Sequence, residues 1–560
     1  MDLWRILRRD ALRNMQPLML LAVLAAALNL ALLTSLNSAL VIMDDPEGLQ
    51  RLLFIFLLSA FSWRFAQGWM MSAASKRMQA ALAVLRVDLL RRAVAADLPD
   101  AMAVGSSRLA QVAGPELQLL AQAVPTLVIS FQSVAAIVLC LLYLATLSNA
   151  AVLIVLGFLT VGGILITRSV LRLERLSETI HEAEGALSER SDHILQTLRE
   201  CKLNRRRAAN ALSDATACAE ALRKERHRFG AEYSHYFTLS ELTYYAALAG
   251  IIFLLPAVTS TDIATVVLAG HAAAFIAYPV ITIVASYPSY ISAETAARSY
   301  LAVEAELKAP PRPATSRPAQ RRAKDTPPTG FADFSTLALD GASYRHPGRD
   351  GTGSFTVGPI DLTVERGSVV FVTGHNGAGK STLIHLLLGL YPAQRGSLTV
   401  DGTVVTADTL GSYRDLFSVV FSDNHVTRQL YGAVSLEDGF ADELLDLLEM
   451  SDKVAVEDRA FTTVDLSQGQ KKRLALAAAL LERKPVLVLD EWAADQSPYF
   501  RRKFYREIIP WMKARGITVI AVTHDDAYFD AADVQIQVEQ GGIRRLDTTP
   551  TLPAPDLLPA

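Results

Sequence analysis

Apolar residues in this chain of 560 residues concentrate before position 300, in runs separated by charged or polar stretches. A helix needs about 20 mostly apolar residues to cross a bilayer. The pattern therefore predicts six membrane-spanning helices, at about residues 18–43, 51–73, 121–146, 149–170, 240–259 and 263–288.

The first apolar run follows four arginines, an arrangement that a secretion signal also shows. Those arginines are Arg5, Arg8, Arg9 and Arg13. The run from Leu18 to Met43 is nevertheless too long for a signal peptide, and Asp44-Asp45-Pro46 follows it in place of a small-residue cleavage site. We therefore predict an uncleaved first helix.

The segments between the runs differ in charge. An acidic turn, Asp44 to Glu47, follows the first run, whereas the long segments after the second and fourth runs are basic, as in Arg205-Arg206-Arg207. Lys and Arg are enriched in cytoplasmic loops, so all loops agree on a multi-pass topology with both termini in the cytoplasm. The expected location is a bacterial inner (plasma) membrane.

The second half of the chain has a different pattern. Residues 308–330 are rich in Pro, Arg, Ala and Thr, which predicts a linker. From 331 to 546, short β-rich runs alternate with helical ones, which predicts an α/β domain with a largely parallel sheet. The Pro-rich residues 547–560 are expected to be a disordered tail. The predicted fold is an all-α membrane domain over 1–307 fused to an α/β nucleotide-binding domain.

Composition excludes several classes of protein. With 51% hydrophobic and 20% charged residues, the chain is too apolar to be disordered. The net charge of −3 and the few aromatic residues among the basic segments argue against nucleic acid as a partner. None of the three cysteines forms a CxxC pair, so neither a disulfide scaffold nor a cysteine zinc site is expected.

One segment of the α/β half matches the phosphate-loop pattern GxxxxGK[ST]. It reads Gly374-His375-Asn376-Gly377-Ala378-Gly379-Lys380-Ser381, and Thr382 follows it. Glycines let backbone N–H groups converge on phosphate oxygens at the start of a helix. Lys380 is expected to reach the β- and γ-phosphates of ATP, and the Ser381 hydroxyl to bind Mg²⁺. Because a strand is expected before the loop and a helix after it, a chance match to the pattern is a weak alternative.

An apolar run further along, Val486 to Leu489, ends in two carboxylates, Asp490 and Glu491. A buried strand that ends at a nucleotide site would place Asp490 where it holds the metal and its waters. Glu491 would then act as general base on the attacking water. By itself, such a pair also suits a helix cap, and its position after the phosphate loop favours the catalytic interpretation.

Two more segments complete an ordered set: Leu466-Ser467-Gln468-Gly469-Gln470 before a helical run, and Val522-Thr523-His524-Asp525 after a strand. In this order the motifs of residues 335–545 resemble those of ATP-binding cassette transporters, and the layout resembles exporter-type half-transporters. The resemblance implies that Ser467, Gln468, Gly469 and Gln470 form the signature that closes on the γ-phosphate of ATP held by the opposite subunit. It also implies that His524 is the switch histidine, although a lone histidine after a strand is more often structural.

Three positions depart from the family pattern. His346 stands where many cassettes carry the aromatic residue that stacks on adenine, and Tyr344 is an alternative. Ser422, or Asp423, stands where a metal-sensing glutamine is usual, and Ser497 replaces the usual interface aspartate, with Asp495 two residues earlier. Hydrolysis remains expected, because Lys380, Asp490, Glu491 and His524 are all present.

One phosphate loop and one signature per chain imply that a working unit contains two chains, most simply a symmetric homodimer. The segments LSQGQKKRLAL, LDEWAADQ and THDDAYFDAAD resemble the cyclic-peptide and siderophore-peptide exporters, of the pyoverdine, syringomycin and microcin J25 type. The resemblance implies ATP-driven export of a peptide or peptide-derived siderophore. Alternatives are a lipid, drug or siderophore transporter, exporting or importing, and an ATP-binding membrane regulator that does not pump.

Few polar residues interrupt the membrane runs, and a charge there is costly unless it faces a cavity or a partner. Arg64, Gln132 and Glu241 are the candidates for contact with the transported molecule. Arg64 either meets an acidic substrate or pairs with Glu241 as a structural lock.

Overall fold

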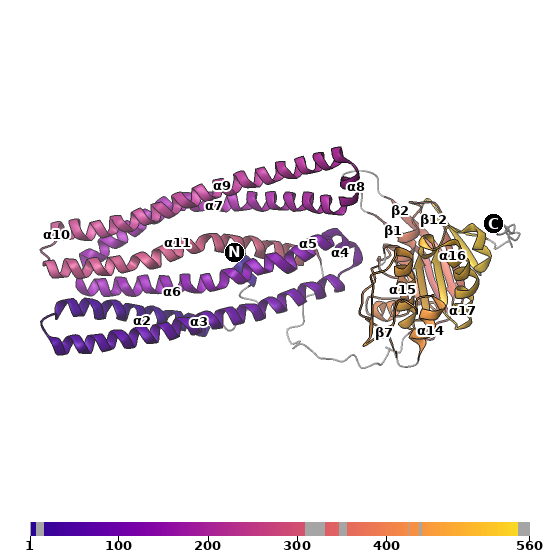
Figure 1. The fold of residues 1–560 in the computed structure, drawn as a ribbon, viewed down its shortest axis with the longest axis horizontal. Coiled ribbons are helices and arrows are strands. Elements are labelled where there is room, and N and C mark those ends of the chain that lie inside the picture. The colour runs from indigo at the N-terminus through magenta and orange to yellow at the C-terminus, as the bar shows by residue number, and fades with distance from the viewer. Residues whose placement is uncertain are drawn as a thin grey trace. The chain divides into compact units, whose positions relative to one another are not determined.

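The structure is a computed structural model that describes residues 2–6, 16–307, 331–346, 355–423, 425–434, 436 and 439–546. The chain divides into two compact units, a helical one that ends before the 308–330 segment and an α/β one that follows it (Figure 1). The predicted linker at 308–330 and the predicted tail at 547–560 lie outside the described residues.

In the described part of the chain, six helices are long and apolar enough to cross a membrane, as the hydropathy pattern predicts. They are α2 (Gln16–Val41), α3 (Pro46–Ala95), α6 (Leu117–Leu147), α7 (Asn149–Gln196), α9 (Arg205–Ala249) and α11 (Ile263–Glu306). Shorter helices flank them: α1 (Asp2–Ile6), α4 (Leu98–Val104), α5 (Ser106–Gln111), η3 (Val112–Glu116), α8 (Leu198–Leu203), η4 (Gly250–Leu254) and α10 (Leu255–Val258). Most of the long helices extend well beyond the apolar runs from which they are predicted.

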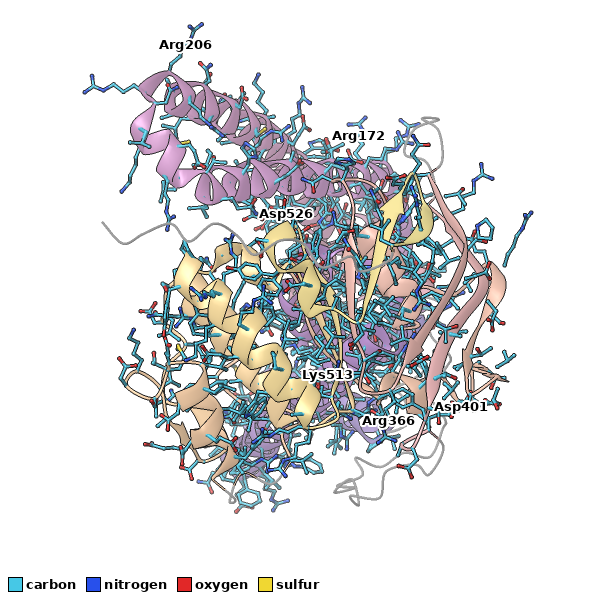
Figure 2. All side chains as sticks on the ribbon, turned by 90° about the vertical axis from the view of Figure 1, so that its right-hand side faces the viewer. Arg172, Arg206, Arg366, Asp401, Lys513 and Asp526 are labelled. Carbon is cyan, nitrogen blue, oxygen red and sulfur yellow. The ribbon has the colours of Figure 1, made fainter. Side chains whose placement is uncertain are left out.

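Helices α7 and α9 run side by side as a long hairpin closed by α8 (Figure 1). Their close approach depends on Gly162, where an added Cβ would lie 2.2 Å from Thr243 Cγ2. Further along, Arg172 of α7 pairs with Glu232 of α9 at 3.5 Å. Figure 2 shows Arg172 on this hairpin and Arg206 at its tip, where the side chain points into solvent. This ion pair lies beside an apolar cluster that includes Leu173 and Tyr236, so both kinds of contact hold the hairpin together.

Two sheets form the α/β unit. The smaller, antiparallel sheet has the order β2-β1-β4-β5. Its strands are β1 (Thr336–Arg345), β2 (Thr356–Glu365), β4 (Arg395–Val400) and β5 (Thr403–Val404). The Asp401 carboxylate, labelled in Figure 2, accepts hydrogen bonds from the N–H groups of Ser335 and Thr336, which ties the turn after β4 to the start of β1.

The larger sheet has the order β12-β11-β3-β10-β9-β6 and is parallel except for β12. Its strands are β3 (Val369–Thr373), β6 (Phe417–Val420), β9 (Val486–Asp490), β10 (Thr518–Val522), β11 (Val534–Glu539) and β12 (Gly542–Leu546). Strands β3, β9 and β10 are buried along their whole length, as expected of parallel strands covered on both faces. Both the helical and the α/β halves of the predicted fold are confirmed.

The remaining elements of the α/β unit are short. A β-ribbon pairs β7 (Val456–Glu457) with β8 (Ala460–Phe461). The helices are α12 (Lys380–Leu387), α13 (Leu410–Arg414), α14 (Phe440–Leu447), α15 (Gln468–Leu481), η5 (Trp492–Asp495), α16 (Pro498–Lys503), η6 (Phe504–Ile508), α17 (Ile509–Ala514) and η7 (Asp526–Ala531). One core joins α14, α15 and α16–α17 to the large sheet, and a second joins α12 to both sheets.

Candidate functional site

Four neighbouring parallel strands end at one edge of the large sheet, and the candidate residues follow them directly. Val522 of β10 pairs with Asp490 of β9 on one side and with Val372 of β3 on the other. Val420 of β6 pairs with Leu489, so β6 ends level with these strands. In α/β sheets, ligands bind at the carboxyl ends of the strands. The register therefore brings the phosphate loop, the carboxylates, His524 and Ser422 to a common edge.

The phosphate loop joins β3 to α12 through glycines in left-handed or extended conformations. Gly374 has a φ of +143° and Gly379 a φ of +108°, and a Cβ on Gly374 would lie 2.4 Å from the main-chain oxygen of Val538. Lys380 is 6% exposed, and its Nζ donates hydrogen bonds to the main-chain oxygens of Gly374 (2.9 Å) and His375 (3.2 Å). The ammonium is thus held within the loop, where it would face bound phosphates.

The other loop residues are arranged as a phosphate cradle requires. His375, Asn376 and Gly377 are exposed at its tip, and Ala378 closes the turn by donating its N–H to the His375 oxygen at 3.1 Å. Ser381 is exposed in the first turn of α12. The position of this hydroxyl at a helix N-terminus suits the predicted metal ligand.

Asp490 is the last residue of β9, and its side chain is almost completely buried. At the next residue, Glu491, the chain turns out of the sheet. Glu491 adopts the left-handed conformation, with φ +49° and ψ +36°. A residue with a Cβ pays about 1–3 kcal/mol for this conformation, which is typical of functional sites. Neither carboxylate caps the following helix η5. Glu491 thus stands at the N-cap position of η5 without the side-chain capping bond that the helix-cap alternative requires.

The Glu491 carboxylate lies between two nitrogen-bearing side chains. Its Oε1 is 3.3 Å from His524 Nε2 and 3.9 Å from Lys380 Nζ. The His524 segment is held from behind, because the buried Tyr505 hydroxyl bonds Thr523 Oγ1 (2.6 Å) and Asp525 Oδ2 (2.9 Å). The predicted catalytic group of Lys380, Glu491 and His524 is therefore gathered in one place.

Ser422 lies against Asp490, the predicted metal ligand, and interacts with this carboxylate through both its side chain and its main chain. Burial raises the pKa of Asp490, and the nearby charge of Glu491 raises it further, while the two interactions with Ser422 act in the opposite direction. A buried carboxylate beside a second one is stabilised by a cation, so Asp490 suits a Mg²⁺ ligand.

The signature segment begins α15 with a capping box. Ser467 Oγ accepts from the N–H of Gln470 (3.4 Å), and Gln470 Oε1 accepts from the N–H of Ser467 (3.1 Å). Ser467 and Gln468 are exposed, whereas a Cβ on Gly469 would lie 2.9 Å from the Asp495 main-chain oxygen. The α15 N-terminus thus presents its N–H groups outward while its back packs on the loop after β9.

Lys472 links this helix to Glu491, the predicted general base. Its side chain is 6% exposed, and Nζ donates to the main-chain oxygen of Glu491 (2.9 Å) while pairing with Asp495 Oδ2 (2.8 Å). The indole N–H of Trp492 donates to the main-chain oxygen of Lys472 at 2.7 Å. Asp495 is therefore committed to Lys472, and Ser497 caps α16 by accepting from the N–H of Phe500.

His346 lies beside the phosphate loop at the end of β1. Its Nε2 is 2.9 Å from Thr382 Oγ1, and its ring stacks at 6.5 Å on Phe355, which begins the chain into β2. Phe355 is 40% exposed and would touch a Cβ on Gly379. Tyr344 is buried beneath and meets the His346 ring edge-on. His346 and Phe355, rather than Tyr344, are thus available to a purine.

Comparisons with known proteins agree with this geometry. A family model described as ABC transporter matches residues 357–494. The energy-coupling factor transporter ATP-binding protein EcfA1 of Lactiplantibacillus plantarum is 31% identical over 218 residues, which cover 37% of this chain and 76% of that protein. The chain belongs to the ABC transporter family.

Two further matches describe this ABC transporter more closely. The ATP-binding protein SyrD of Pseudomonas syringae pv. syringae is 47% identical over 205 residues, and the match spans 36% of each protein. The structure of a bacterial Atm1-family ABC exporter with ATP bound superimposes with a TM-score of 0.72 at 18% identity and covers 96% of this chain and 94% of that one. This likeness extends the shared fold to the helical unit.

The candidate residues of the helical unit of this ABC transporter are not gathered. Arg64 is exposed on α3 and Glu241 half-buried on α9, and among the residues that the structure describes no ion pair joins them. The predicted lock between Arg64 and Glu241 is therefore absent from the single chain. Gln132 is 8% exposed on α6, and its Oε1 has no hydrogen-bond partner within the described part of the chain.

Three residues of the nucleotide site escaped the sequence analysis. Phe355 follows a polar segment without a recognisable strand pattern, Lys472 looks like one more charge on an amphipathic helix, and Tyr505 looks like an ordinary core aromatic. Their roles arise from contacts between segments distant in sequence.

Replacing Phe355 by Ala is expected to raise the KM for ATP about tenfold, because stacking on one base is worth about 1–3 kcal/mol. The kcat should stay nearly unchanged, since the Phe355 ring stacks on His346 and not on Lys380, Glu491 or His524. Inhibition by inorganic tripolyphosphate, which has no base, is the matched control. An equal loss of affinity for tripolyphosphate would show that Phe355 acts through the loop and not through the purine.

Proposed function

We propose that this protein is an ATP-driven transporter that hydrolyses ATP between two copies of itself and exports a peptide or peptide-derived siderophore. The observation that carries the proposal is the cluster of Lys380, Glu491 and His524 at the end of parallel strands, in a chain with six helices able to cross a membrane. Its expected location is the bacterial inner membrane, with both termini in the cytoplasm.

The chain's own residues supply most of the hydrolytic machinery. Glu491 accepts a proton from the attacking water, and His524, 3.3 Å away, orients the water and the γ-phosphate. Lys380 binds phosphate oxygens from within the loop. Asp490 and Ser381 offer the oxygen ligands that Mg²⁺ prefers, and the ion would neutralise charge on the phosphates.

Three observations support a second copy. The signature is exposed at the N-terminus of α15, where N–H groups attract anions. No hydrogen bond or ion pair joins Ser467–Gln470 to the phosphate loop within the described residues of one chain. Each chain carries one of each motif. A C2 dimer would place each signature over the other chain's phosphate loop.

The cargo class rests on the motif resemblance to cyclic-peptide and siderophore-peptide exporters. Membrane vesicles with the cytoplasmic face outward test it directly. We expect them to take up labelled peptides of these two classes with ATP, and not with a non-hydrolysable analogue.

Several outcomes would contradict this proposal in different ways. Uptake of labelled lipid but of no peptide would favour the lipid transporter. Release of preloaded peptide from the vesicles on addition of ATP would reverse the direction. Hydrolysis without movement of any labelled compound would favour a regulator that does not pump.

A further inference from the structure

Two adjoining cavities lie inside the helical unit, with volumes of about 190 and 330 Å³. Both are lined by Leu119 of α6, Ser177 and Ile180 of α7, and Ser292 of α11. Glu116 and His181 face the smaller cavity, and Arg226 faces the larger one. The space is therefore polar on several sides, partly open to the surroundings, and lined by helices distant in sequence.

Glu116 is the buried acid of this space. It ends the π-helical turn η3, which contains Pro115, and π-helical turns are frequent at functional sites. The residue is 5% exposed, and in the part of the chain that the structure describes its Oε2 has no hydrogen-bond partner. Burial raises the pKa of Glu116, while His181 and Ser299 act in the opposite direction; His181 Nε2 lies 3.9 Å from Oε1, at ion-pair but not hydrogen-bonding distance.

Arg108, whose charge acts on Glu116, and Arg226 of the larger cavity are both paired with other acids. Arg108 forms a two-pronged pair with Glu306, at 2.7 and 3.0 Å. Arg226 of α9 pairs with Glu184 of α7. Because a buried carboxylate without a close cation is costly, Glu116 is compensated only in part, by His181 at 3.9 Å and by the more distant charge of Arg108.

We propose that these cavities bind a cationic group, an ammonium or guanidinium, with Glu116 as its counter-ion. The hydroxyls of Ser177 and Ser292 would accept its remaining hydrogen bonds, and Leu119 and Ile180 would pack on an attached apolar group. In assigning this cation to the transported molecule, the inference rests on the proposed function.

Charge-selective labelling of the full chain in nanodiscs tests the site without ATP. Thr295→Cys places a thiol in the wall of the smaller cavity, with Cys201 and Cys218 replaced by Ala and the fully buried Cys140 retained. Methanethiosulfonates carrying an ammonium, a sulfonate or no charge then report the local potential. After correction for reactivity with a free thiol, the ammonium reagent should react about tenfold faster than the sulfonate.

The Glu116→Gln substitution should bring these two labelling rates close together. In the chain that retains Glu116, 2-phenylethylammonium should slow labelling of the thiol, whereas the uncharged 2-phenylethanol should not. Glu182→Gln is the matched control, because Glu182 is exposed on α7 and absent from the cavity walls. Equal rates for the two charged reagents in the chain that retains Glu116 would overturn the proposal, even if Glu116→Gln failed to fold. So would a preference that survives Glu116→Gln.

The outcomes separate this inference from the proposed function. If the chain shows the charge preference but hydrolyses no ATP, the cation site stands and the proposed pump is refuted. If the chain hydrolyses ATP but lacks the charge preference, the proposed pump stands and the cation site is refuted. If both stand, 2-phenylethylammonium should stimulate hydrolysis in the chain that retains Glu116 and not in the Glu116→Gln variant.

Discussion

Replacing Glu491 by Gln is expected to lower the kcat for ATP hydrolysis about 10²- to 10⁴-fold, the range that a positioned general base contributes. The amide keeps the size of the side chain but removes the proton acceptor that lies 3.3 Å from His524. ATP binding should survive, because Lys380 is held by the loop oxygens and reaches Glu491 only at 3.9 Å. Phosphate release measured beside equilibrium ATP binding separates the two effects.

Glu507→Gln provides the matched control. Glu507 is an exposed glutamate of the same unit, so this substitution makes the same chemical change away from the site. Unchanged steady-state hydrolysis in the Glu491 variant would mean that another group activates the water. Loss of ATP binding would instead place Glu491 in the binding site.

Replacing Lys472 by Met should lower the kcat about 10²-fold with a small change in the KM for ATP. Lys472 Nζ bonds the main-chain oxygen of Glu491 at 2.9 Å and so holds a residue whose φ is +49°. Without that bond the strained backbone can relax, and a displacement of about 1 Å at a catalytic group can cost 10²-fold in rate. The steady-state constants kcat and KM check the prediction.

The neighbouring Lys471→Met substitution serves as the control, since Lys471 lies on the same helix and its side chain is half-exposed. A positioning role also predicts that Lys472→Arg, which keeps the charge and a donor, restores part of the kcat. If both Met variants lost activity and thermal stability to the same extent, the two lysines would have only a structural role in the helix.

Local patterns made much of the fold and site predictable. The phosphate loop, the carboxylates after β9 and His524 after β10 each follow a short apolar strand, and parallel strands bring such residues to one edge automatically. The six helices were equally predictable from hydropathy. Their full lengths were not, because hydropathy reports only the lipid-facing part of a helix such as α3, which continues to Ala95.

The missed residues depend on tertiary register. Lys472 acquires its role only when α15 packs against the loop after β9, and Phe355 only when β1 and β2 align across a segment of polar composition. Glu116 also could not be recognised from the sequence. A single Glu before an apolar helix looks like the polar end of a membrane span, and its position matters only once the partners of Arg108 and Arg226 are known. Among the described residues of the single chain, Arg64 and Glu241 form no ion pair, because two rare membrane charges need not share a helix interface.

The central claim, two chains that enclose two ATP molecules, is tested most directly by native mass spectrometry of the Glu491→Gln chain. The full chain in nanodiscs would be incubated with Mg²⁺ and ATP and then freed of unbound nucleotide. The account predicts particles with two chains and two retained ATP molecules, and a single chain without ATP when Ser467 is also replaced by Arg. Particles that hold one chain and one tightly bound ATP would contradict it.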